Sequence, residues 1–337
     1  MSPQRRALAR SVQITSHGGV DVIDIVETER PVPGPGEVLV EVLAAGINHV
    51  EAYLRQGVYH GELDVHLPIG QGSDFAGLVS TVGGGVTSFA KGSEVIGHTS
   101  MASHATFIVV PASILVKKPA SLSWEVAGSL FLAGLAAEDA VESVGIGRGD
   151  VVVVSAAAGG VGSIEAHLAM AKGATVIGTC GERNFDYLRQ IGVKPVVYGA
   201  GLADRIRTMA PRGVAAFLDN FGQDNPDVAA ELGVGPERFR SSEDRRRVEL
   251  AAMQPTDEES QNQTRILAKL AGMAADRSLN ILISGFYPFD QVREAFDDLE
   301  KRHARGKIVL GMRPANSSFH GLGGRKVRDE QERSYGR

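Results

Sequence analysis

Residues 151–162 read Val-Val-Val-Val-Ser-Ala-Ala-Ala-Gly-Gly-Val-Gly, and this stretch decides the fold. Four consecutive valines predict a strand buried within a parallel sheet. A glycine-rich turn follows and opens an apolar helix, predicted over residues 161–172. Backbone N–H groups at such a helix start can face a diphosphate, and the helix dipole favours its negative charge. The stretch therefore predicts a strand, turn and helix that bind a dinucleotide.

Five residues of this turn form the predicted diphosphate site: Ala158, Gly159, Gly160, Val161 and Gly162. Gly159 lets the backbone approach a ligand closely, and Gly162 lets the helix pack tightly on the strand. Ala157 stands where the usual motif has its first glycine. A turn with a purely structural role is the alternative, but the strand before it and the helix after it favour binding.

The chain around this turn divides into regions with different patterns. Strands and helices alternate through residues 125–278, which predicts a doubly wound Rossmann domain. Residues 1–124 contain short strands separated by glycine turns. Residues 279–314 add a strand at 279–284, a helix from Phe289 to about Arg305 and a closing strand at 307–312. We therefore expect an α/β protein with a second, β-rich domain. The glycine-rich, charged tail at 315–337 is expected to be disordered.

Residues 236–263 break the alternation. They carry a dense charge run at 243–247 and a polar stretch at 256–263, so a solvated loop or surface helix is the simplest interpretation. The next amphipathic helix is expected to begin at Thr264. A fifth strand of the Rossmann sheet should lie near residues 239–243, although this segment is unusually polar for one.

The charge balance and cysteine count narrow the class of protein. The 337 residues carry 35 Lys and Arg against 40 Asp and Glu, a formal net charge of −5. No basic field draws such a protein onto nucleic acid or an anionic membrane, and no apolar run approaches the ~20 residues that cross a bilayer. Cys180 is the single cysteine, which suits a reducing compartment. We expect a cytoplasmic protein that acts on a small molecule.

The end of the second Rossmann strand bears on the choice of cofactor. An NAD-dependent enzyme places an Asp or Glu there to bind the adenosine ribose, whereas this chain has Thr179 and Cys180. Arg183 could pair with a 2′-phosphate, and Tyr198 could add a hydroxyl. Glu182 argues for NADH, and Arg183 could also be a solvated surface arginine. On balance the sequence predicts NADPH.

The histidine pattern predicts no metal site. Nine histidines are present, but none forms a cluster with metal-ligand spacing, and a predicted turn separates His98 from His104. A surface or hydrogen-bonded core position is the simpler interpretation of each. Without zinc, alcohol oxidation lacks its Lewis acid. Hydride delivery to an already polarised acceptor, such as an enone or a quinone, is the chemistry that remains.

Five motifs occur in the order that one family shows. They are Gly-Glu-Val-Leu-Val at 36–40, Ala-Gly-Ile-Asn at 45–48, Gly-Ser-Asp-Phe-Ala-Gly at 72–77, Ala-Ala-Gly-Gly-Val-Gly at 157–162 and Gly-Lys-Ile-Val-Leu at 306–310. Together they resemble the zinc-free quinone oxidoreductase and enoyl reductase family of medium-chain dehydrogenases/reductases. The resemblance spans about residues 12–312. It implies a GroES-like catalytic domain built from both ends of the chain, an inserted Rossmann domain and a homodimer.

The resemblance also implies roles for single residues. Asn48 matches an asparagine near the nicotinamide ribose, and Tyr53 matches a cleft tyrosine of quinone reductases. Tyr59 lies in a segment similar to that of enoyl-thioester reductases, whose tyrosine is a proposed proton donor. Because a phenol can protonate an enolate as it forms, Tyr59 is our first choice as general acid and Tyr53 our second. Alternatively, each tyrosine only packs, with its hydroxyl satisfied.

The chain departs from the family pattern at several positions. Gly181 and Phe185 stand where relatives carry a phosphate-binding serine and lysine, and His49 stands where proline is common. Ala136 replaces a threonine that often lies near the nicotinamide. Three hypotheses follow. The first is an NADPH-dependent reductase of an enone, enoyl or quinone acceptor. The second is a non-redox cyclase or isomerase on the same fold, and the third is a nucleotide-sensing scaffold.

Overall fold

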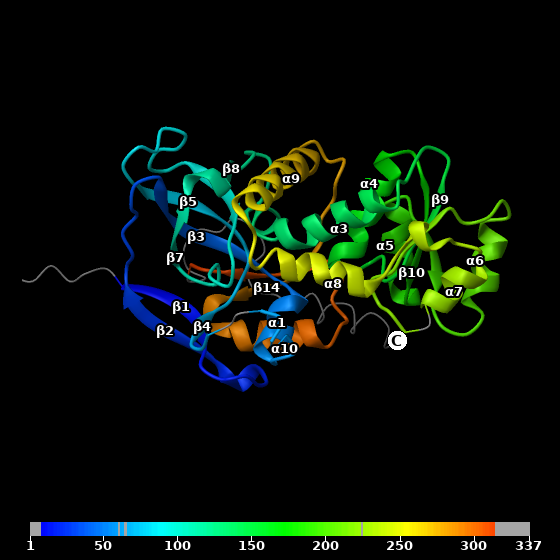
Figure 1. Ribbon diagram of the computed structural model, residues 1–337, viewed down its shortest axis with the longest axis horizontal. Helices are drawn as coiled ribbons and strands as arrows, with labels where there is room; N and C mark the ends of the chain where they lie inside the picture. The colour runs from blue at the N-terminus through cyan, green and yellow to red at the C-terminus, as the bar shows by residue number, and fades with distance from the viewer. Residues whose placement is uncertain (1–7, 60, 64–65, 224, 314–337) are drawn as a thin grey trace, which may run out of the picture. The chain divides into compact units, whose positions relative to one another are not determined.

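The computed structural model describes residues 8–59, 61–63, 66–223 and 225–313, and the chain divides into two compact units (Figure 1). One unit takes the described residues of Met1–Leu132, Ala252–Ala271 and Ile283–Arg337. The other takes those of Ala133–Ala251 and Gly272–Leu282. These bounds differ from the expected ones because 252–271 group with the β-rich unit. The tail predicted to be disordered lies outside the described residues.

The second unit is a parallel sheet of the doubly wound kind. Its five strands follow the order β11-β10-β9-β12-β13, so the order reverses between β9 and β12. Their bounds are β9 Val151–Val154, β10 Thr175–Cys180, β11 Lys194–Val197, β12 Ala216–Leu218 and β13 Phe239–Arg240. Val153, Ile177 and Phe217 from the three central strands are fully buried in one apolar cluster. The predicted Rossmann domain is confirmed, including its polar fifth strand.

Helices connect these strands, and α4 begins one residue before the predicted 161–172. They are α3 Phe131–Ser143, α4 Gly160–Ala171, α5 Phe185–Gln190, α6 Leu202–Met209, α7 Asn225–Glu231 and α8 Ser242–Ala251. Short 3₁₀ segments lie at Val20–Val22, Ala112–Ile114, Glu182–Asn184, Pro236–Arg238 and Phe289–Gln291. The charge run at 243–247 lies on α8, so the surface-helix interpretation of this segment is confirmed.

Two antiparallel-rich sheets form the first unit. A seven-stranded sheet runs β14-β15-β3-β5-β6-β8, with β7 paired to β3, and a smaller sheet runs β2-β1-β4. Ile308 on β15 pairs with Ile47 on β3, so both ends of the chain build one sheet, as the resemblance implies. The strands are β1 Leu8–Ile14, β2 Ile23–Glu29, β3 Glu37–Ile47, β4 Ile69–Gly70, β5 Asp74–Val82, β6 Glu94–His98, β7 Phe107–Pro111, β8 Leu115–Lys117, β14 Ile283–Pro288 and β15 Lys307–Gly311.

Four more helices lie in the described residues, and the predicted start of one of them is wrong. They are α1 His49–Arg55, α2 Trp124–Ala127, α9 Asp257–Ala275 and α10 Val292–Glu300. Helix α9 begins seven residues before the predicted Thr264, because Thr256 and Glu259 form a capping box. The Thr256 backbone N–H donates to the Glu259 carboxylate (2.7 Å), and the Glu259 N–H donates to Oγ1 of Thr256 (3.3 Å). Helices α2 and α3 are separate because the Gly128 carbonyl accepts the Gly46 N–H of β3 (2.6 Å).

Two further predictions near the end of the chain need correction. The strand predicted over 279–284 begins only at Ile283, because Leu279 and Ile281 are apolar through burial in the core rather than through pairing in a sheet. The helix predicted to reach Arg305 ends at Glu300. Within the described part of the chain, no helix has the length and apolar character needed to cross a membrane.

Candidate active site

The glycine turn after β9 is built so tightly that only small residues fit. Ala156 has a positive φ of 47°, a conformation that bends the chain sharply. A Cβ on Gly162 would lie 2.6 Å from the Ala156 carbonyl oxygen and 3.0 Å from Cα of Ala157. Both neighbours are backbone atoms that cannot move aside. Gly162 therefore holds the start of α4 against the turn, as predicted for the packing glycine.

The start of α4 offers backbone donors to an anion. Gly159 is the N-cap residue, and no side chain caps the helix there. The first N–H groups of a helix have no partner within it, so those of Gly160, Val161 and Gly162 are available. Ala158 is buried, while Gly159, Gly160 and Val161 are partly exposed. This cradle fits the diphosphate of a dinucleotide, because it combines close backbone approach, donors and a favourable helix dipole.

Residues at the ends of β10 and β11 lie beside this turn in different ways. Thr179 is buried, and its Oγ1 accepts the Ala156 N–H (3.2 Å), so it shapes the turn rather than facing solvent. Arg183 is exposed in the 3₁₀ segment after Gly181. Tyr198 is 62% exposed, and its hydroxyl lies 3.8 Å from where a Cβ on Gly181 would be. The Tyr198 hydroxyl therefore lies beside Gly181, at the end of β10.

Sequence reasoning missed a polar network at the point where the strand order reverses. Ser155 follows β9 and donates its hydroxyl to Oδ1 of Asp219 (2.8 Å) after β12. The Asn220 N–H donates to Oγ of Ser155 (2.7 Å), and its side-chain amide donates to the Ser155 carbonyl (3.2 Å) and the Glu165 carboxylate. These bonds tie the carboxyl ends of β9 and β12 together, at the edge where such sheets bind ligands.

Glu165 is the unusual member of this network. It lies on α4 and is only 2% exposed. Burial raises its pKa to about 7, and the nearby Asp219 charge acts in the same direction. The Asn220 hydrogen bond and the charge of Arg245 on α8 oppose this rise. The atypical segment 240–251 therefore supplies a cation beside the dinucleotide turn.

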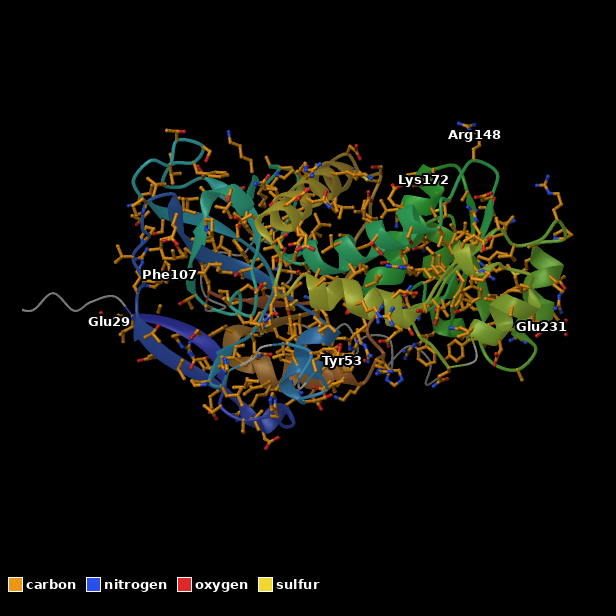
Figure 2. All side chains as sticks on the ribbon, in the orientation of Figure 1. Glu29, Tyr53, Phe107, Arg148, Lys172 and Glu231 are labelled. Carbon is orange, nitrogen blue, oxygen red and sulfur yellow. The ribbon has the colours of Figure 1, made fainter. Side chains whose placement is uncertain are left out.

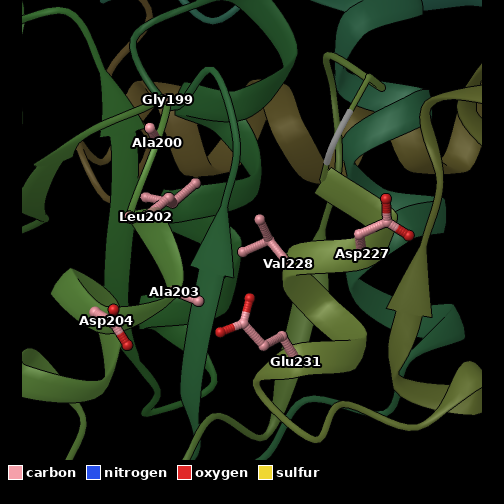
Figure 3. A pocket seen from close by; sticks show the side chains of 9 residues that line it. Gly199, Ala200, Leu202, Ala203, Asp204, Asp227, Val228 and Glu231 are labelled. Atoms are coloured by element: carbon pink, nitrogen blue, oxygen red, sulfur yellow. The ribbon is translucent and has the colours of Figure 1, made fainter.

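One pocket of the Rossmann unit does not suit the cofactor. It has a volume of about 260 Å³ and lies between the start of α6 and helix α7 (Figure 3). Three carboxyl side chains line it, those of Asp204, Asp227 and Glu231. Arg207 pairs with Asp204 (2.6 Å) and Glu231 (3.0 Å). Because the lining carries a net negative charge, it would repel the phosphates of a dinucleotide.

In the first unit, Asn48 belongs to a buried polar cluster. Asn48 caps α1 in a capping box with Glu51. The Lys307 ammonium on β15 donates to Oδ1 of Asn48 and lies 3.6 Å from Oδ2 of Asp74. Asp74 in turn accepts the Leu132 N–H at its other oxygen (2.9 Å). The Gly72–Gly77 motif, the Ala45–Asn48 motif and the Gly306–Leu310 motif thus meet around one lysine.

This cluster contains one acid whose protonation is shifted. Burial raises the pKa of Glu51 to about 7, and the Asp74 charge raises it further, whereas the bonds from Asn48 and the charge of Lys307 lower it. Burial lowers the pKa of His104 to about 4, although the Gly46 carbonyl, 3.0 Å from its Nε2, favours the protonated ring. His104 is therefore neutral at pH 7. Asn48 is 7% exposed, so its amide is held almost entirely by protein groups.

The two candidate tyrosines lie together but in different surroundings. Tyr53 is on α1, partly exposed, and Tyr59 follows the helix and is 2% exposed (Figure 2). Their rings meet edge to face with centroids 6.2 Å apart, and the His49 ring stacks on Tyr53 at 6.2 Å. His49 therefore packs against the tyrosine. The Tyr53 hydroxyl oxygen accepts a hydrogen bond from Nη2 of Arg302 (2.8 Å).

Ser73 and His98 make contacts within the core of the first unit. Ser73 is fully buried, and its hydroxyl lies 3.7 Å from the Met253 sulfur. His98 stacks on Phe131 at 4.4 Å and lies 3.0 Å from the Thr264 hydroxyl, so it is a hydrogen-bonded core residue. Among the residues that the structure describes, no group of three His, Cys, Asp or Glu side chains could hold a metal ion.

Comparisons with known proteins agree with this architecture. The family described as "Alcohol dehydrogenase GroES-like domain" matches residues 34–120, and that described as "Zinc-binding dehydrogenase" matches 135–310. A probable quinone oxidoreductase of Schizosaccharomyces pombe is 27% identical over 326 residues, which cover 89% of this chain and 96% of that protein.

Solved structures show the same arrangement. The quinone oxidoreductase from Coxiella burnetii superposes with a TM-score of 0.75 and 26% identity, covering 91% of this chain and 100% of the other. The CurK enoyl reductase has a TM-score of 0.79 over 90% and 99% of the two chains, but at 22% identity it shows the fold alone. Since one family match spans more than half of the chain, the protein belongs to the medium-chain dehydrogenases/reductases, nicotinamide-dependent oxidoreductases, in their quinone oxidoreductase-like branch.

Proposed function

We propose that this protein is an NADPH-dependent reductase that delivers hydride to an enone, enoyl or quinone acceptor without zinc. The observation that carries the proposal is the turn at Ala156–Gly162, where a backbone-packed glycine and an uncapped helix start form a diphosphate cradle. The names of two relatives, both quinone oxidoreductases, support a quinone as the acceptor.

NADPH is preferred over NADH on the charges near the adenosine end. Arg183 and Tyr198 flank Gly181, and the strand that ends there carries no carboxylate in its last two residues, Thr179 and Cys180. An arginine can bind a 2′-phosphate through two parallel hydrogen bonds. The exposed Glu182 opposes this preference, so the ratio of kcat/KM for NADPH and NADH is the direct measurement.

The reaction needs no metal in this proposal, because the acceptor is already polarised. The bound nicotinamide supplies the hydride. The chain must then deliver one proton to the reduced acceptor, and Tyr53 suits this role better than Tyr59, because its hydroxyl lies on a partly exposed side chain. Asn48, fixed by Lys307 and Glu51, is the proposed neighbour of the nicotinamide ribose.

The Gly162→Val variant tests the cofactor site. Its side chain would meet the Ala156 carbonyl, so we expect NADPH binding to weaken at least ~10-fold, about 1.4 kcal/mol. Gly272→Ala is the matched control, because a Cβ there meets nothing within 4 Å. Calorimetry measures the affinity, and absorbance at 340 nm measures turnover with a panel of enones and quinones.

The result separates this proposal from the alternatives. Turnover by wild-type protein that Gly162→Val loses supports the reductase. NADPH binding without oxidation of any acceptor would instead favour a non-redox enzyme or a nucleotide sensor. Failure of wild-type protein to bind either NADPH or NADH would refute the proposal. We further propose a cytoplasmic homodimer, which light scattering on the purified protein would test.

A further inference from the structure

Arg302 occupies an unusual backbone position beside the candidate proton donor. It follows the end of α10, where its N–H donates to the Leu299 carbonyl (3.0 Å) and its φ is +54°. Helices that end in this left-handed conformation normally place glycine there, because a Cβ is strained in it. A long, charged side chain at this point therefore calls for a reason beyond closing the helix.

The side chain reaches across to α1, which lies almost 250 positions earlier in the sequence. Its Nη2 donates to the Tyr53 hydroxyl oxygen at 2.8 Å. The acids nearest in sequence have other partners: Glu300 pairs with Arg55, Asp298 accepts from the Tyr287 hydroxyl (2.9 Å), and Asp297 pairs with Lys301 (2.6 Å). Among the described residues, Arg302 makes no ion pair with a carboxylate within 4.0 Å. Within the described ranges, the contact that its guanidinium makes with another side chain is the one to the Tyr53 phenol.

The chemistry of the two groups fixes the direction of this hydrogen bond. A guanidinium has five N–H donors and no acceptor, so the phenol oxygen must accept. The hydroxyl hydrogen of Tyr53 then points away from Arg302. The ring itself is held by His49 on one side and by the edge of Tyr59 on another. Arg302 therefore holds the Tyr53 hydroxyl in place but cannot accept its proton.

We propose that Arg302 is a positioning residue that holds Tyr53 with its hydroxyl proton directed to the acceptor and offsets the charge left when that proton departs. The inference rests on the proposed reductase function. Hydride adds to the electron-poor carbon of the acceptor, the Tyr53 O–H bond breaks, and its proton joins the resulting enolate or hydroquinone anion. The phenolate remains beside the guanidinium until a proton from solvent restores the phenol.

Kinetics of five variants test the role. Arg302→Gln should lower kcat with 1,4-naphthoquinone about 10-fold and leave the Kd for NADPH within twofold of wild type. Arg302→Lys should recover part of the loss, because an ammonium also donates to the phenol. Arg293→Gln is the matched control: this arginine on α10 binds the Ile23 carbonyl (2.7 Å) and Asp24 (3.1 Å) instead. Tyr53→Phe combined with Arg302→Gln should lose no more than Tyr53→Phe alone.

A spectroscopic measurement on the cofactor-free protein tests the contact itself. The chain has six tyrosines, so protein labelled with 3-fluorotyrosine gives few ¹⁹F signals, and the one that Tyr53→Phe removes belongs to Tyr53. We expect Arg302→Gln to shift that signal and Arg293→Gln to leave it in place. An unmoved signal, or multiplying losses in the double variant, would overturn the inference. If wild-type protein turns over and Arg302→Gln is equally fast, the inference alone fails; if wild-type protein binds no NADPH, the proposed function fails as well.

Discussion

Replacing Glu165 with glutamine is expected to stabilise the Rossmann unit at pH 8 and to change little at pH 5. The carboxyl is 2% exposed on α4, and burial raises its pKa from 4.5 to about 7. The bond from Asn220 and the charge of Arg245 favour the ionised form, but they do not offset the cost of burial. At pH 8 wild-type protein therefore contains a buried carboxylate that is only partly compensated.

The sign and size of this stability change follow from proton linkage. Between pH 4.5 and 7 the folded protein binds this proton more tightly than the unfolded chain does, so stability falls as pH rises through that window. A difference of roughly 2.5 pH units corresponds to ~3 kcal/mol at most. Glutamine never ionises, and its side-chain oxygen can still accept from Asn220. We therefore expect a gain of about 1–3 kcal/mol at pH 8.

Urea unfolding at pH 5 and pH 8 measures this effect. The single tryptophan, Trp124, lies in the other unit, so far-UV circular dichroism is the suitable probe. Glu231→Gln is the control, because Glu231 is an exposed carboxylate on α7 that pairs with Arg207. Its replacement should change the free energy of unfolding by nearly the same amount at both pH values. A Glu165→Gln protein that is equally or less stable than wild type at pH 8 would show that Arg245 and Asn220 fully compensate the charge.

Three further changes probe other parts of the molecule. Lys307→Met leaves Asp74 buried without its cation, so the free energy of unfolding measured in urea should fall by ~3–5 kcal/mol. A smaller fall than the same substitution causes at an exposed lysine would show that Lys307 does not compensate the Asp74 charge. Phe217→Ala, at the centre of the Rossmann sheet, should cost ~3–5 kcal/mol by the same assay. Arg183→Ala should reduce the preference for NADPH over NADH about 10-fold in kcat/KM, and an unchanged ratio would remove Arg183 from the 2′-phosphate site.

The sequence predicted the dinucleotide turn and the strands around it because those signals are local. A four-valine strand, a glycine turn and an apolar helix are adjacent in the chain, and each follows from the geometry of its own residues. The predictions for Tyr53, Tyr59 and Asn48 depended on resemblance to a family, because nothing in the spacing of these residues indicates a site. The structure places all three on α1 or directly beside it.

Contacts between segments far apart in the chain could not be predicted from the sequence. Nothing near Glu165 indicates that it faces Asn220 and Arg245, which lie 55 and 80 positions later. The motif Gly306–Leu310 was recognised, but its lysine had no assigned partner until β15 paired with β3. One missed signal was local: Thr256 and Glu259 have the spacing of a capping box, which would have placed the start of α9 correctly.

Two cations of the segment 301–307 donate hydrogen bonds to residues at the start of α1 and within it. Lys307 fixes Asn48 at the start of the helix, and Arg302 fixes Tyr53 one turn later. Arg302 lies between α10 and β15, Lys307 is the first residue of β15, and β15 is anchored by its pairing with β3. A change in this short segment therefore displaces two proposed site residues together, although neither is near it in sequence. The basic run 301–307 is thus part of the proposed site, and its length should matter as much as its charge.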